Sequence, residues 1–166
     1  MPLVLTGSGV ITGLSSQLAD ANMPVGSVLQ VVQATYSTVV TTGGTTFIDT
    51  GLTATITPTS SSNKILVIVC QNGLNVANAV TGISIKLLRG STLITYVGGV
   101  YQSYISTVNS INLPGAYTCF LDSPATTSAT TYKTQFARQD GSGNVQVQTF
   151  GSLGDTSTIT LMEIAA

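Results

Sequence analysis

The chain has 166 residues, a formal net charge of -1 and charged side chains at only 7% of its positions. This is the length of one ordinary domain, and a hydrophobic content of 43% excludes a disordered chain. Five basic residues offset by six acidic ones cannot form the clustered positive patch that nucleic acid requires, and no apolar run approaches the roughly 18 residues of a membrane span. We therefore expect neither a nucleic-acid partner nor membrane insertion, and a surface suited to packing against copies of itself.

The first 26 residues are punctuated by glycine and differ from the rest of the chain. One short helical turn is possible at Ser15–Asn22, ended by Met23 and Pro24. The segment is too small to have its own core, so it is either disordered or packs on something else. Its candidate contact residues are the apolar ones: Leu3, Val4, Leu5, Val10, Ile11 and Leu14.

From residue 27 onward the chain is rich in β-branched and aromatic residues, with turn signals at short intervals. We predict strands at Val28–Tyr36, Leu52–Thr57, Lys64–Gln71, Gly82–Arg89, Thr92–Val97, Tyr117–Asp122, Thr130–Ala137, Val145–Phe150 and Thr158–Ile164, with a further one around Tyr101–Ile111. Nine or ten short strands and no sustained helical period indicate an all-β protein, an antiparallel β-sandwich of the jelly-roll type. The predicted organisation is a segment of residues 1–26 followed by one sandwich domain of residues 27–166.

Two kinds of strand pattern are visible in the sequence. Alternation of apolar and polar residues at 52–57 and 83–87 predicts strands with one buried and one solvated face. Ile65–Val69 is apolar at every position, which is typical of a central strand covered on both sides. Thr130–Ala137 alternates as well, so the Ser- and Thr-rich stretch before it, Ser123–Ala129, is a connection within one domain rather than a linker between two.

Catalytic and cofactor motifs are weak. The chain has no histidine, which removes the usual general base and the triads built on it. Ser61–Lys64 matches S-x-x-K but lies at a turn before a strand, and Gly7–Gly13 resembles a phosphate loop without the strand and helix that would frame it. The acidic residues are dispersed along the chain. We expect a protein that is not an enzyme and has no cofactor.

Two loop features leave alternatives open. Asp140–Asn144 resembles the first half of a calcium loop but lacks the later acid, so a hairpin turn is the favoured interpretation. Tyr96, Tyr101 and Tyr104 lie in a Gly- and Ser-rich stretch and are either partner or receptor contacts or ordinary core tyrosines.

Cys70 and Cys119 each sit in an apolar run. We predict buried free thiols, which fits folding in a reducing cytosol. A disulfide between them is the alternative.

Four stretches of the sequence resemble, in this order, a domain of virion proteins from marine and cyanobacterial tailed phages: Met23–Thr38, Asp49–Asn72, Leu121–Phe136 and Ser157–Ala166. The resemblance implies a jelly-roll module of virion-surface appendages that is usually trimeric, and it carries no catalytic residues. The expected protein is a small trimeric capsid-decoration (cement) or short-fibre protein on the particle, anchored to other virion proteins through residues 1–26. The alternative is a tail-fibre module that binds a host surface glycan or protein.

Overall fold

The computed structural model describes residues 23–77, 81–99, 103–105, 111–149 and 155–166. Regular structure in these ranges consists of β-strands alone. The eleven strands are β1 (Val28–Tyr36), β2 (Val40–Thr42), β3 (Ile48–Ile56), β4 (Lys64–Val76), β5 (Thr81–Arg89), β6 (Thr92–Tyr96), β7 (Ser103–Ile105), β8 (Ile111–Asp122), β9 (Thr130–Arg138), β10 (Val145–Val147) and β11 (Ser157–Ile164).

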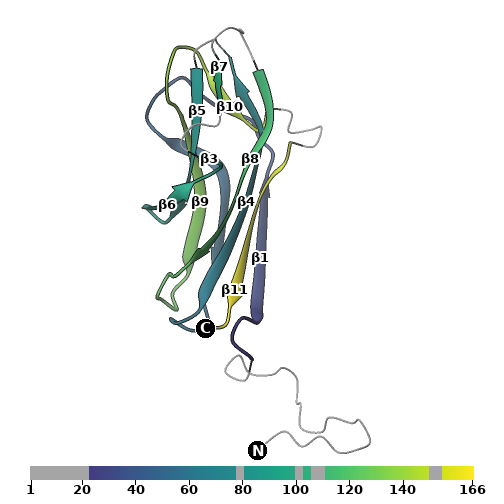
Figure 1. Ribbon diagram of the computed structural model, residues 1–166, viewed down its shortest axis with the longest axis vertical. Coiled ribbons are helices and arrows are strands. Elements are labelled where there is room, and N and C mark those ends of the chain that lie inside the picture. Colours follow the sequence, from purple (N-terminus) through teal and green to yellow (C-terminus); the bar gives the residue numbers. More distant parts are fainter. Residues whose placement is uncertain (1–22, 78–80, 100–102, 106–110, 150–154) are drawn as a thin grey trace, which may run out of the picture.

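The strands form two antiparallel sheets that face one another (Figure 1). Sheet I has the order β1-β11-β4-β8, and the short β10 and β2 extend it beyond the far end of β4. Sheet II has the order β3-β9-β5, and β5 then pairs with both β6 and β7. Apart from β5 and β6, which are neighbours in sheet II, the eight main strands alternate between the sheets, and the first lies beside the last, which is the strand order of a jelly roll. The predicted fold class is confirmed.

The core lies between the two sheets and follows the predicted alternation. Leu52, Ala54 and Ile56 of β3 are buried, and the threonines between them are exposed. On β9, Tyr132 and Phe136 are fully buried while Lys133 and Gln135 face outward. Hydrophobic burial of these inner faces is what holds the two sheets together.

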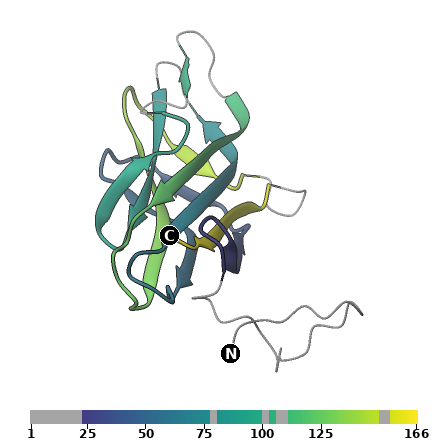
Figure 2. The same ribbon diagram turned by 60° about the horizontal axis from the view of Figure 1, so that its bottom comes forward.

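Both ends of the described sandwich meet at one end of the molecule (Figure 2). The amide of Gly26 donates to the carbonyl of Ala165 over 2.8 Å, and the amide of Ala165 donates to Ser27 over 2.9 Å. Close by, the Glu163 carboxylate accepts hydrogen bonds from Gln30 at 2.6 Å and from Asn63 at 2.7 Å. These contacts fasten β1 to β11 at the point where the chain enters the sandwich.

Strand bounds differ from the prediction mainly where a strand runs past a polar or glycine residue. β4 continues to Val76 and β8 begins at Ile111, because each pairs with the other along its whole length. β2 was not predicted, since three residues carry too little periodicity. Part of the further strand predicted around Tyr101–Ile111 lies outside the described residues, and β7 falls within it.

Several connections cross between the sheets, and two of them test expectations from the sequence. Ser123–Ala129 joins β8 of sheet I to β9 of sheet II, as expected for a connection inside one domain. Asp140–Asn144 joins β9 to β10, which lie in different sheets, so the predicted hairpin is wrong. The turn predicted at Ser61–Lys64 is present, with the amide of Asn63 donating to the carbonyl of Ser60.

Candidate functional site: the apolar face of sheet I

The outer face of sheet I, which points away from the core, brings together side chains from four strands. The register places Val31, Met162, Leu66 and Leu121 in one row that runs straight across β1, β11, β4 and β8. The next row along pairs Ile68 with Cys119, and the following one pairs Cys70 with Tyr117. We call this surface the apolar face; its apolar residues are Val28, Val31, Leu66, Ile68, Cys70, Tyr117, Cys119, Leu121, Met162 and Ile164.

Much of the apolar face is open to solvent in the single chain. Val31 is 56% exposed, and Tyr117 and Leu121 are each 54% exposed. The outward side chains of β4 are only half-buried, with the pattern alternating along the strand. The prediction that Ile65–Val69 is covered on both sides is therefore wrong for the single chain. β4 is central in its sheet, but sheet II covers one of its faces only.

The apolar face has almost no charge. Lys64 is the charged residue that the four strands place on it, at one end of β4, and its Nζ donates to the Ser123 hydroxyl over 2.8 Å. Glu163 and Asp122 belong to the same strands but are buried on the inner side. A charged partner would thus find no complementary group here, whereas an apolar one would lose little by desolvating the face.

β8 is also an edge strand. It pairs with β4 on one side, and no described strand pairs with its other side. Natural sheets commonly block such edges with charged residues or proline. Pro114 does so near one end of β8, but Gly115–Leu121 contains neither. The backbone of this stretch therefore remains available to another strand.

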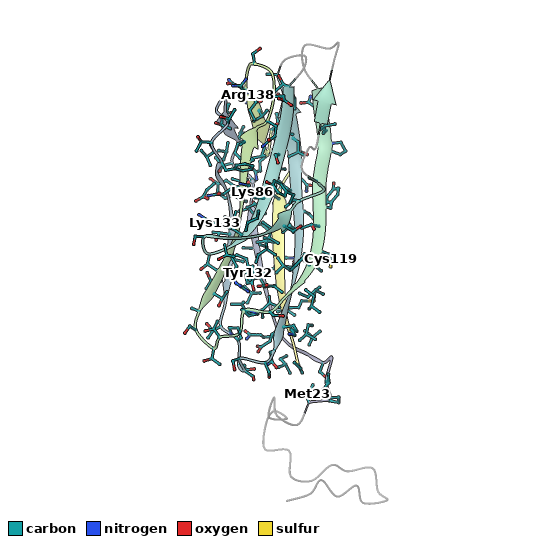
Figure 3. The ribbon with its side chains drawn as sticks, turned by 60° about the vertical axis from the view of Figure 1, so that its left-hand side comes forward. Met23, Lys86, Cys119, Tyr132, Lys133 and Arg138 are labelled. Carbon is teal, nitrogen blue, oxygen red and sulfur yellow. The ribbon has the colours of Figure 1, made fainter. Side chains whose placement is uncertain are left out.

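The inner side of β8 adds to the exposed apolar surface. Phe120 lies opposite the buried Val67 of β4, yet it is 36% exposed because the sandwich is open between its edge strands β8 and β6. Leu93 of β6 is also 45% exposed, but it alternates with Ile94, which packs against the core, and so lies on the outer face of sheet II. Figure 3 shows Cys119 pointing away from the body of the sandwich at this edge. Apolar side chains thus extend from the apolar face around β8.

An ionic cluster fixes the end of β8 nearest the chain termini. Asp122 Oδ2 accepts a hydrogen bond from Arg89 of β5 at 2.7 Å and one from the Tyr132 hydroxyl of β9 at 2.6 Å. Burial and the hydrogen bond to Asp122 raise the pKa of Tyr132, so this hydroxyl stays a donor. All three groups are engaged with one another, and the cluster ties β8 to sheet II rather than offering a reactive site.

The outer face of sheet II has the opposite character (Figure 3). Lys133 forms a 2.9 Å ion pair with Asp49, and Gln135 donates to the same carboxylate. Burial alone would raise the pKa of Asp49, but the hydrogen bonds from Lys133 and Gln135 lower it below its ordinary value. Beside this pair is an open hollow of about 110 Å³ lined by Asp49, Gly51, Leu52, Thr53 and Lys133. Ligand pockets usually start at about 300 Å³.

The contact residues suggested by the sequence are mostly not placed by the structure. Most of them lie outside the described residues: Leu3, Val4, Leu5, Val10, Ile11, Leu14 and Tyr101. Tyr104 is in β7, and only its backbone is described. Tyr96, half-buried at the end of β6, lies opposite Lys86, whose ammonium sits 3.5 Å from the centre of the Phe47 ring.

The two cysteines are free, as predicted, but they are not buried. Cys119 is exposed and Cys70 is half-buried. The apolar runs around them belong to strands whose outer face sheet II does not cover, which is why both thiols face outward. Cys119 lies opposite Ile68, so the two cysteines are diagonal neighbours on the apolar face.

Sequence reasoning missed the apolar face as a site, although a signal was present. Tyr117–Leu121 carries apolar residues at both parities of a strand, and so does Ile65–Val69. Two such strands side by side leave apolar residues outside the core whichever way they face.

Other site classes find little support in the part of the chain that the structure describes. No three His, Cys, Asp or Glu side chains gather there as a metal site. Nor does a helix long and apolar enough for a membrane span occur in those ranges.

Comparison with known proteins gives a structural likeness and no match in sequence. No family model matches the chain, and no curated protein matches it. Among solved structures, the chain is similar to that described as "Crystal structure of infectious bursal disease virus VP2 subviral particle", with 11% sequence identity and a TM-score of 0.40. The match covers 84% of this chain and 39% of that one, so the chain spans well under half the length of the viral protein.

Proposed function

We propose that the chain is a non-enzymatic structural protein of a bacteriophage virion. It acts as a small trimeric capsid-decoration (cement) or short-fibre protein on the particle surface, with residues 1–26 anchoring it to capsid or tail proteins. The observation that carries the proposal is the apolar face, because an exposed, nearly uncharged sheet surface is suited to protein contact and to little else. The resemblance of four stretches of the sequence to phage virion proteins supports the same conclusion.

Jelly-roll domains are common in viral capsids, but they also occur in lectins and in enzymes. The fold is therefore compatible with a virion role without selecting it. What favours a structural role is the distribution of polar groups. The buried carboxylates of Asp122 and Glu163 accept hydrogen bonds from segments distant in the sequence and so tie the sandwich together, which is a stabilising arrangement.

The proposal is tested by looking for the protein in purified particles of the phage that encodes it. We expect many copies per particle by quantitative mass spectrometry and a matching density on the particle surface by electron microscopy. A variant lacking residues 1–22 should be produced but left out of the particle. Absence of the intact protein from purified particles would contradict the proposal.

A second function, recognition of a host surface glycan or protein, is favoured by the outer face of sheet II. There Lys86 lies over Phe47 and 5.9 Å from the centre of the Tyr96 ring, an aromatic and cationic group of a kind common in binding surfaces. If this group binds the host, Tyr96→Ala weakens binding of the protein to host cells. Tyr117→Ala, on the opposite side of the molecule, is the matched control and should not.

A further inference from the structure

We propose that the occupant of the apolar face and of the β8 edge is a second copy of this chain. The inference rests on the proposed function and deepens it, since it names the partner of the same surface. In a ring of identical subunits, β8 of each copy would lie at the contact with its neighbour.

The first argument is that β8 needs a strand beside it. The stretch Gly115–Leu121 presents one row of unpaired backbone groups, and these are best satisfied by another extended strand. The edge on the other side of sheet I is different. There β1 lies against β3 of sheet II, and Gln30 donates across this corner to the carbonyl of Thr57 over 2.8 Å. The molecule is thus closed along β1 and open along β8.

The apolar face is chemically complementary to the same face of a second copy. Along β4 and β8 the apolar face offers a new partner aliphatic side chains, Tyr117 and two thiols. Beside them β1 and β11 place uncharged Gln33, Thr158 and Thr160, and the single ammonium, on Lys64, already has a hydroxyl acceptor. A partner recognised by charge would need an opposite charge here. An identical copy needs only the same apolar groups, which is how isologous and ring interfaces of homo-oligomers are built.

The area of the apolar face and the β8 edge also favours a second copy as the partner. Four strands about 4.8 Å apart and four rows of outward residues about 7 Å apart cover on the order of 500 Å². Gln33, Thr158 and Thr160 lie within this area, so its apolar part runs mainly along β4 and β8. Adding the backbone edge of β8 with Phe120 extends this surface toward the about 800 Å² that each partner contributes to a specific interface.

The sequence of β4 favours the same occupant. Its apolar run has the composition of a strand covered on both faces, but the single chain covers one. A copy seated on Leu66, Ile68 and Cys70 would cover the other, and the sequence and the structure of this strand would then agree.

The test uses the full chain and two variants at micromolar concentration. Leu121→Glu places a carboxylate on the proposed contact, in the row of Leu66 and Met162, and Thr55→Glu places one at an exposed strand position on the outer face of sheet II. We expect the wild-type protein and Thr55→Glu to be oligomeric by multi-angle light scattering. For Leu121→Glu we expect the dissociation constant to rise at least about tenfold, because burying an unpaired carboxylate costs more than the about 1.4 kcal/mol that tenfold represents.

Cys119 supplies an independent readout at the contact itself. It is exposed in the single chain, so in a monomer it should react freely with a thiol reagent such as DTNB. We expect it to react at least about tenfold more slowly in the wild-type oligomer than in Leu121→Glu, because a covered thiol reacts only when the contact opens. Tyr117→Lys, also at an exposed position, is the second variant should Leu121→Glu fail to fold.

Several outcomes would overturn the inference. One is a wild-type monomer with a reactive Cys119; another is an oligomer that Leu121→Glu leaves intact or that Thr55→Glu dissociates equally. A wild-type monomer with a protected Cys119 would assign the face to the chain's own residues 1–22. A monomer that is nevertheless found in purified particles would refute self-association through β8 while leaving the proposed function standing.

Discussion

The outer faces of the two sheets solve the same structural problem with different chemistry. Both belong to strands that bury one side in a shared core, and both come from a Thr-rich chain with few charges. Sheet II presents hydroxyls, an ion pair between Lys133 and Asp49 and the ammonium of Lys86. Sheet I presents Val31, Leu66, Leu121 and their neighbours, with Gln33, Thr158 and Thr160 among them and a single lysine at one end. A contiguous apolar surface marks a contact face more often than a solvated one, so the difference indicates which face the proposed self-association would cover.

The largest expected effect on stability is the difference between substitutions on the inner and the outer side of one strand, β11. Leu161 and Met162 are consecutive on β11; the first is fully buried in the core and the second lies on the apolar face. Leu161→Ala should lower the free energy of unfolding by about 2–5 kcal/mol at any protein concentration, because it leaves a cavity.

Met162→Ala should cost less than about 1 kcal/mol in dilute protein, as exposed substitutions do. It should cost more when the protein is concentrated, since contacts between copies then contribute to stability. Urea unfolding at two protein concentrations measures both effects. Equal behaviour of the two variants at both concentrations would remove the distinction between the two sides of sheet I.

The next effect concerns the attachment of β8 to sheet II. Asp122→Ala leaves the buried Tyr132 hydroxyl without its acceptor and Arg89 without its counter-ion. We expect a loss of about 2 kcal/mol, below the 3–5 kcal/mol of a fully buried pair because Arg89 reaches solvent. Tyr132→Phe, which removes a single hydrogen bond, should cost about 1 kcal/mol. If urea unfolding shows no loss for Asp122→Ala, the cluster does not hold β8 in place.

A pH effect is expected at the end of the sandwich where β1 meets β11. Burial by itself would raise the pKa of Glu163, but hydrogen bonds from Asn63, Gln30 and Thr59 outweigh it and lower the pKa below its ordinary value of 4.5. A carboxyl whose pKa is lowered by folding stabilises the native state above its unfolded pKa. That contribution is lost as the pH falls from about 4.5 through the lowered value.

Glu163→Gln should therefore remove part of the decline in stability below pH 4.5, which thermal unfolding at several pH values would detect. Asp49→Asn is the matched control, since its carboxyl also has a lowered pKa but is exposed and screened by solvent. A decline that is identical in Glu163→Gln and the wild type would contradict this role of Glu163.

The smallest effect is expected on the solvated face. The ion pair between Lys133 and Asp49 joins two partly exposed side chains, and such pairs contribute about 0–1 kcal/mol. Lys133→Met should change stability by no more than this, and the change should shrink in high salt. A larger loss, insensitive to salt, would show that the outer face of sheet II is covered as well.

The sequence was sufficient for what depends on local pattern. Alternation at Leu52–Thr57 and Thr130–Ala137 predicted both the strands and their buried sides, because one face of a strand repeats every second residue. The same rule was misleading at Ser84, which is buried although it faces outward. The loop that leads into β3 lies over this part of sheet II, where Gly44 accepts a hydrogen bond from Arg138 and Phe47 packs on Lys86.

The candidate site could not be predicted in the same way, since it depends on register between distant strands. Leu66 and Leu121 are opposite one another on β4 and β8, and nothing local to either residue reveals the other. The sequence showed that Ile65–Val69 is apolar on both sides, but not that the chain itself covers one side alone. The prediction of buried thiols was wrong for the same reason: Cys70 and Cys119 lie on the side that the chain leaves open.

The central claim, that the apolar face and β8 form the contact surface of the assembled protein, is tested most directly by hydrogen–deuterium exchange of the β8 backbone. In a separate chain the amides of Gly115–Leu121 that point away from β4 have no partner and exchange quickly. We expect these amides to be protected in concentrated protein or on the particle and to exchange quickly after dilution, while the exchange rate of the β3 amides does not change. Fast exchange of β8 in the assembled state, at the rate seen in the separated chain, would contradict it.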